Sequence, residues 1–142
     1  MAEKHIENML NISMNIKKNS KIFNLRKEFN SIYPNLALHI LKKPAMTPNK
    51  DDICDIYRTV GECCKKVKDG TIDISSNRKI QQVINDFKKI GIDVAICHPR
   101  FCYDYDPVGF VMHFYPALDI ANPTLEEFNK PKKGEEDYYH LV

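Results

Sequence analysis

The sequence lacks any apolar run long enough to cross a membrane, because no stretch approaches the roughly 18 apolar residues that such a helix needs. No apolar segment typical of a signal peptide precedes the five cysteines. We therefore expect a soluble, cytoplasmic protein whose thiols are reduced. The net charge is only +2, so the chain lacks the large positive excess expected of a dedicated nucleic-acid binder.

Motifs for phosphate binding and nucleophilic catalysis are also missing. The sequence contains no Gly-rich phosphate loop and no nucleophile elbow. These absences argue against the common nucleotide-binding and hydrolase classes, and we expect a non-enzymatic protein without a cofactor.

The composition is that of an ordinary globular protein. A chain of 142 residues, with 43% hydrophobic and 28% charged residues, fits one domain. Charge is unevenly divided, since residues 1–68 hold 13 Lys/Arg against 7 Asp/Glu and residues 69–142 hold 8 against 12. The halves therefore carry +6 and −4. We interpret these charges as those of a solvated surface, and the difference between the halves is also compatible with head-to-tail association.

An internal repeat organises the chain. Residues 72–98 predict a strand, a helix and a strand, and residues 14–40 match them at a constant offset of 58 positions. Equivalent pairs along the match are Ile16 and Ile74, Lys21 and Lys79, Ile22 and Ile80, Phe29 and Phe87, and Leu38 and Ile96.

Hydrophobic periodicity predicts the elements. Alternating apolar residues indicate strands near residues 12–16, 36–40, 72–74 and 92–96, and apolar residues at helical spacing indicate helices over 22–32 and 80–90. We expect Ser20 to cap the first of these helices and Gly91 to end the second in a left-handed conformation.

Further elements are predicted outside the repeat. A helix is expected over about 50–66, although the capping box formed by Thr59 and Glu62 would allow it to begin only there. Residues 108–115 have strand composition, and a second capping box at Thr124 opens a short helix.

These elements predict an α+β fold. We expect a ferredoxin-like repeat of two βαβ units, with an inserted helix, an added fifth strand and helices mainly on one sheet face. An open α/β sheet is the alternative. The expected organisation is an N-terminal arm at 1–11, one domain at 12–129 and a tail at 130–142.

Several segments resemble a known set of proteins. They are LRKEFNSIYPNLALHILKKP at 25–44, TVGE at 59–62, GTIDIS at 70–75 and TLEEFN at 124–129. They resemble small bacterial α/β proteins of the Bacteroidetes type that are uncharacterised. The resemblance implies a shared fold and carries over no functional residue, and neither the Cys-rich middle segment nor CHPRFCYDYD at 97–106 matches it.

The cysteines provide candidate ligands and nucleophiles. Cys97, His98 and Cys102, with Cys54, Cys63, Cys64 and His113, are of the residue types that bind zinc. Spacing argues against this, because Cys97 and His98 point to opposite faces of a strand and Cys63 and Cys64 diverge on a helix. We therefore expect no metal site, and Cys63 and Cys64 fit the core as small apolar residues.

Three other hypotheses about a functional site stay open. Cys102 with His98 or His113 would form a thiol- or metal-dependent enzyme site in the loop from Cys97 to Cys102. Asp104, Asp106, Glu126 and Glu127 are candidate cation or acid-base groups, although a hydrophilic loop explains them equally well and is the favoured interpretation. An RNA-binding ferredoxin-like domain is the third, but the aromatic strand at 108–114 departs from the register of the known motif.

The leading hypothesis is a non-enzymatic protein-interaction module, for which self-association is one of two expected modes of binding. Aromatic and Arg residues are enriched where proteins bind one another, and a predicted hairpin loop carries four of them. The expected contact residues are Arg100, Phe101, Tyr103 and Tyr105. The expected partner is a protein or a second copy of the chain, with no membrane and no nucleic acid.

Overall fold

The computed structural model describes residues 11–45, 48, 50–97 and 122–130. The predicted arm and tail lie outside this part of the chain, apart from Asn11 and Lys130. The predicted fifth strand at 108–115 also lies outside it.

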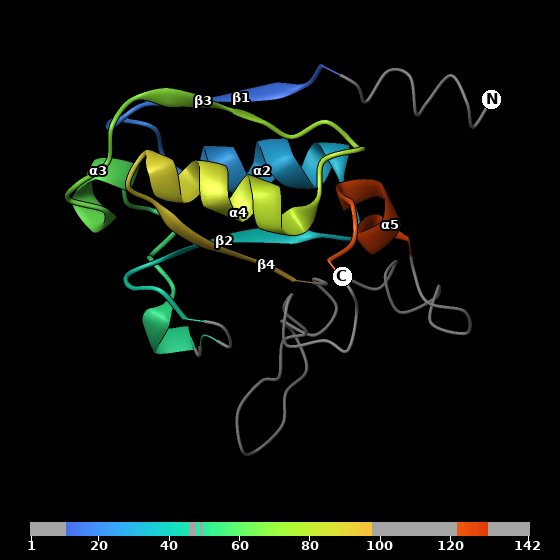
Figure 1. The fold of residues 1–142 in the computed structure, drawn as a ribbon. Helices are drawn as coiled ribbons and strands as arrows, with labels where there is room; N and C mark the ends of the chain where they lie inside the picture. Colours follow the sequence, from blue (N-terminus) through green and yellow to red (C-terminus); the bar gives the residue numbers. More distant parts are fainter. Residues whose placement is uncertain (1–10, 46–47, 49, 98–121, 131–142) are drawn as a thin grey trace, which may run out of the picture.

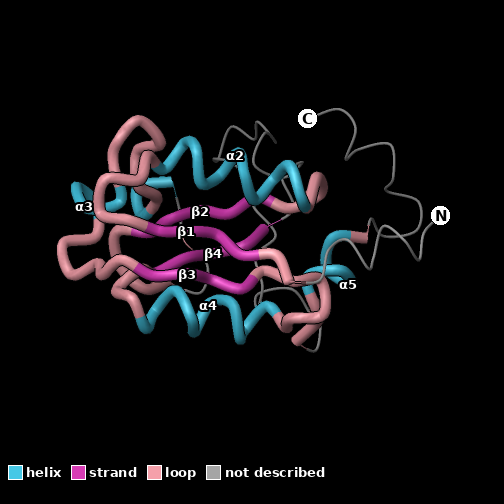
Figure 2. Tube along the Cα trace, turned by 90° about the horizontal axis from the view of Figure 1, so that it is seen from above, coloured by secondary structure: helices cyan, strands magenta, loops and turns pink. Residues whose placement is uncertain are grey.

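The described residues form an α+β structure with four short strands in two antiparallel pairs. Strand β1 (Ser13–Ile16) pairs with β3 (Gly70–Asp73), and β2 (Ala37–Leu41) pairs with β4 (Asp93–Cys97). The two long helices are α2 (Ile22–Ile32) and α4 (Ile80–Lys89). In the view of Figure 1, the two strand pairs lie above and below the layer that holds α2 and α4. Seen from above in Figure 2, α2 and α4 run along the two sides of the strands.

This arrangement corrects the predicted ferredoxin-like sheet with helices on one face. In the described part of the chain, the two strands of each βαβ unit belong to different strand pairs, so no single sheet unites them. Each helix can then bury apolar residues toward both pairs. The core lies between the pairs, where Met14, Phe29, Ile72 and Phe87 are fully or almost fully buried.

Strand register follows the sequence repeat. Met14 pairs with Ile72 and Leu38 with Ile96, and both pairs are separated by the offset of 58 positions. Residues on either side pair reciprocally, because Ser13 faces Asp73 while Asn15 faces Thr71. The two repeats are therefore related by an approximate two-fold axis that passes through both strand pairs.

The predicted helix over 50–66 is much shorter than expected. A 3-10 turn covers Lys50–Asp52, and the regular helix α3 covers only Val60–Cys63. The capping box is confirmed, since the Thr59 side chain accepts from Glu62 N while Glu62 accepts from Thr59 N. Gly61 and the capping box at Thr59 favour a regular helix that begins only after Thr59. This is the alternative that the sequence allowed.

The short helix α5 (Leu125–Asn129) begins with the second predicted capping box, which is also confirmed. Helices α3 and α5 occupy equivalent places, each docked on the turn before a long helix. Val60 N donates to Ser20 O at 2.8 Å, and Leu125 N donates to Arg78 O at 2.9 Å. Each repeat thus consists of a strand, a long helix, a strand and a capped short helix.

Candidate functional site

The predicted contact residues Arg100, Phe101, Tyr103 and Tyr105 lie outside the described residues. The same holds for His98, Cys102 and His113, so both the enzyme alternative for that loop and the expected absence of a zinc site there stay predictions. The strand at 108–114, on which the RNA-binding alternative depends, is likewise outside this part. Cys97 is described and is buried in β4.

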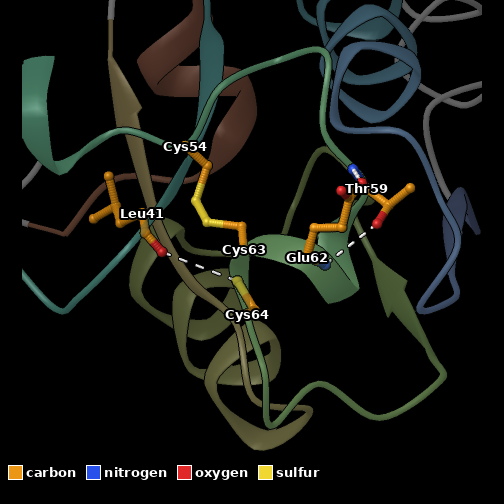
Figure 3. Close-up of a disulfide and its surroundings, with 6 residues drawn as sticks. All are labelled: Leu41, Cys54, Thr59, Glu62, Cys63 and Cys64. Carbon is orange, nitrogen blue, oxygen red and sulfur yellow. Dashed lines mark hydrogen bonds between the residues drawn. A yellow bond between two sulfur atoms is a disulfide. The ribbon is translucent and has the colours of Figure 1, made fainter.

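A cluster of three cysteines is the densest group of chemically reactive side chains among the described residues. The sulfur atoms of Cys54, Cys63 and Cys64 all lie within 4.8 Å of one another. Cys54 belongs to the irregular segment before α3, Cys63 is the last residue of α3, and Cys64 is its C-cap. We call these three residues the cysteine cluster (Figure 3).

A disulfide joins two members of the cluster. Cys54 and Cys63 are bonded, with their Cα atoms 6.2 Å apart, within the range usual for disulfides. The expectation that all five thiols are reduced is therefore wrong for this pair. That expectation rested on the missing signal peptide and the odd number of cysteines, and neither feature reports which side chains the fold brings together.

The prediction that Cys63 and Cys64 diverge on a helix is also wrong. Helix α3 ends at Cys63, and Cys64 adopts an extended backbone with φ −108° and ψ 91°. The change of backbone conformation between the two residues brings both sulfurs into one cluster. A continuous helix would have separated adjacent side chains by about 100° around its axis.

The Cys64 thiol is buried beneath the disulfide. Its Sγ lies 4.0 Å from the carbonyl oxygen of Leu41 at the end of β2 (Figure 3). Burial raises the pKa of the Cys64 thiol, and the nearby Asp93 carboxylate raises it further. Cys64 is therefore a protonated thiol at neutral pH and a weak nucleophile.

The disulfide opens onto a pocket of about 550 Å³. Its wall contains both signs of charge. The lining residues are Lys42, Ile53, Cys54, Asp55, Arg58, Glu62 and Cys63. Both carboxylates are hydrogen-bonded, since Asp55 Oδ1 accepts from Tyr57 N at 2.9 Å and Glu62 Oε1 accepts from Thr59 N at 2.9 Å.

Exposed aromatic residues lie next to this pocket. Within the described ranges, Tyr57 and Phe23 are the large hydrophobic residues that stay exposed, at 82% and 46%. Their segments are adjacent, because Phe23 N donates to Ile56 O at 2.9 Å. We call Phe23, Tyr57 and Arg58 the Tyr57 surface.

Neither the cysteine cluster nor the exposure of Tyr57 was predicted from the sequence. The cysteines of the cluster are separated by irregular backbone, so their proximity depends on where α3 begins and ends. The signal that could have indicated the cysteine cluster was the capping box at Thr59, because it marks the start of α3 and leaves Cys54 outside the helix. The exposure of Tyr57 was hidden because its position fits the apolar period of the longer predicted helix.

In comparisons with protein-family models, curated proteins and solved structures, no match to this chain was found. Among the described residues, no helix is sufficiently long and apolar to traverse a lipid bilayer.

Proposed function

We propose that the protein is a non-enzymatic interaction module that binds a second copy of itself through the Tyr57 surface. The observation that carries this proposal is the 82% exposure of Tyr57, whose segment is hydrogen-bonded to the backbone of the half-exposed Phe23. Large aromatic residues are commonly buried or half-buried, and an exposed pair next to an Arg has the composition of a binding hot spot.

The backbone that presents these side chains is already ordered. Tyr57 N donates to Asp55 Oδ1 at 2.9 Å, and Arg58 N donates to Asp55 O at 3.1 Å. Ile22 N then donates to Arg58 O at 3.0 Å, which ties the segment to the start of α2. An ordered segment loses less conformational entropy on binding than a flexible one, and this supports a role in association.

The charges around Tyr57 favour a second copy as the partner. Arg58 pairs with Glu62 at 3.3 Å, and both groups are largely exposed. Asp55 adds a second carboxylate to the same region. A two-fold contact places each surface against itself, so a surface with both signs can pair Arg58 of one copy with a carboxylate of the other. The net charge of +2 opposes such a contact only weakly.

The test is sedimentation velocity over a range of protein concentrations, with the wild type, Tyr57→Ala and Phe23→Ala. We expect a concentration-dependent dimer, and at least tenfold weaker association for Tyr57→Ala, equal to about 1.4 kcal/mol. Lys65→Ala is the control, because this side chain is exposed and lies outside the Tyr57 surface. A wild type that is monomeric throughout, or a Tyr57→Ala dimer of unchanged strength, contradicts the proposal.

A further inference from the structure

The geometry points to a thiophilic d10 cation, with Zn²⁺ as its representative, bound by Cys54, Cys63 and Cys64 when the disulfide is reduced. The disulfide and the metal complex are then alternative states of one site. Nothing in this inference depends on self-association, because the cluster and the Tyr57 surface are different groups of residues.

The spacing of the sulfurs suits such an ion. A cation bound at about 2.3 Å from each thiolate in tetrahedral geometry holds its sulfurs about 3.8 Å apart. The three sulfurs of the cluster lie within 4.8 Å of one another. Once the disulfide is reduced, small side-chain rotations are enough to bring them to the required spacing.

The ligand type selects the metal class. Thiolates are soft ligands that favour Zn²⁺ and Cu⁺ over Mg²⁺ and Ca²⁺. The neighbouring carboxylates of Asp55 and Glu62 already accept hydrogen bonds from backbone N–H groups. Cys54 and Cys63 line the pocket, so a water molecule or an added ligand has room to reach an ion bound by them.

The charged residues of the pocket wall cancel one another, so the complex keeps its own net charge. Three thiolates and one Zn²⁺ carry a net charge of −1. Lys42 and Arg58 line the same pocket and supply positive charge, although Asp55 and Glu62 oppose them. On the inner side, Cys64 is held near the Leu41 carbonyl, which orients its sulfur before any ion binds.

The chemical steps balance with a dithiol as the reductant. Thiol–disulfide exchange breaks the Cys54–Cys63 bond, transfers two electrons and two protons to the protein, and converts the dithiol to its own disulfide. Zn²⁺ then binds the three sulfurs and displaces three protons from their thiols. In the reverse direction, exchange with a small-molecule disulfide re-forms the Cys54–Cys63 bond and reduces that disulfide to its dithiol, which removes two ligands, releases the ion and leaves Cys64 to take up a proton.

The test uses the full chain, reduced with a dithiol and then desalted without oxygen. Zn²⁺ affinity and stoichiometry are measured by competition with a chromophoric chelator. We expect one Zn²⁺ per chain for the reduced protein, no binding at this site for the oxidised protein, and at least tenfold weaker binding for Cys63→Ser and Cys64→Ser. Cys97→Ala is the control, because Cys97 lies at the opposite end of the β2–β4 pair from Leu41.

A second measurement avoids the risk that a buried variant misfolds. In the reduced wild type, Zn²⁺ should protect Cys54, Cys63 and Cys64 from iodoacetamide, as located by peptide mass spectrometry. The same titration in Tyr57→Ala should give the same affinity. Absence of Zn²⁺ binding by the reduced wild type, equal binding by the oxidised protein, or protection of other cysteines alone would each overturn the inference.

Discussion

Tyr33 joins the two repeats through a single buried hydroxyl group. The residue follows α2 and is fully buried, and its Oη donates to the carbonyl oxygen of Ile74, just after β3, at 2.6 Å. Burial, with smaller contributions from the carboxylates of Asp73 and Glu126, raises the pKa of Tyr33 well above its usual range. The hydroxyl therefore stays protonated and acts as a donor throughout the neutral range.

Tyr33→Phe should lower the free energy of unfolding by about 1–2 kcal/mol, because the Ile74 carbonyl loses this donor while the ring keeps its packing. Urea denaturation followed by circular dichroism measures the change. Tyr57→Phe, whose side chain is exposed, is the matched control and should have little effect. Equal stability of Tyr33→Phe and wild type would show that water replaces the hydroxyl at no cost.

The sequence predicted the roles of some single residues near helix ends and not of others. Gly91 has φ +86°, as expected of a left-handed helix end, and a Cβ there would lie 2.5 Å from Lys66 O. Ser20 does not cap α2, because its Oγ instead accepts from Lys17 N and the N-cap is Lys21. A polar residue before a helix can close the preceding turn or cap the helix, and sequence alone does not separate these two uses.

At the scale of elements, strongly periodic segments were predicted well and irregular ones poorly. Helices α2 and α4 lie where the apolar stripes placed them. The segment before α3 has the same apolar residues at helical spacing, yet Ile53 forms an antiparallel bridge with Leu41 at the end of β2. Cys54 N donates to Ile40 O at 2.8 Å. Tertiary hydrogen bonds of this kind override local periodicity.

The two capping boxes make stability sensitive to acid. Hydrogen bonds from the backbone N–H groups of Thr59 and Thr124 lower the pKa of Glu62 and Glu127, respectively. A carboxyl group with a lowered pKa in the folded state stabilises the fold above its unfolded pKa, and this contribution is lost as the pH falls through the folded value.

Stability should therefore decrease as the pH is lowered from about 6 to about 3. The double variant Glu62→Gln, Glu127→Gln keeps an acceptor oxygen at each cap and removes the titrating charges, so its loss over the same range should be smaller. Denaturation midpoints at several pH values measure both slopes. Parallel slopes for wild type and variant would assign the acid sensitivity to other carboxylates, such as Asp73, whose pKa is also lowered by hydrogen bonds from Ser75.

At the scale of the molecule, the sequence repeat was visible but its assembly was not. A right-handed crossover usually returns the chain to the sheet that it left, so two βαβ units predict parallel strands within one sheet. Here β1 pairs with β3 and β2 with β4, so each unit obtains its strand partners from the other. Pairing between residues so distant in sequence is decided by how both helices pack, which no local pattern encodes.

This exchange of partners predicts that neither repeat is stable alone as a monomer. Fragments 1–68 and 69–142 should each lack cooperative unfolding when monomeric, because each of the four described strands would lose its observed partner and have unpaired backbone groups. Mixing them should restore strand content and a cooperative transition in circular dichroism. A fragment that melts cooperatively at a temperature independent of its concentration would refute the prediction.

The reciprocal register of the strand pairs gives the chain the form of a fused homodimer. Equivalent strands meet antiparallel about a two-fold axis, as two copies of a half-length ancestor would after gene duplication. Fusion frees the halves to diverge, and the short helices show it, since Cys63 follows Thr59 by the same interval as Phe128 follows Thr124. In the second half that position fills the core with a phenyl ring. In the first half it carries the cysteine that forms the disulfide with Cys54, so within the described residues the cysteine cluster belongs to one half alone.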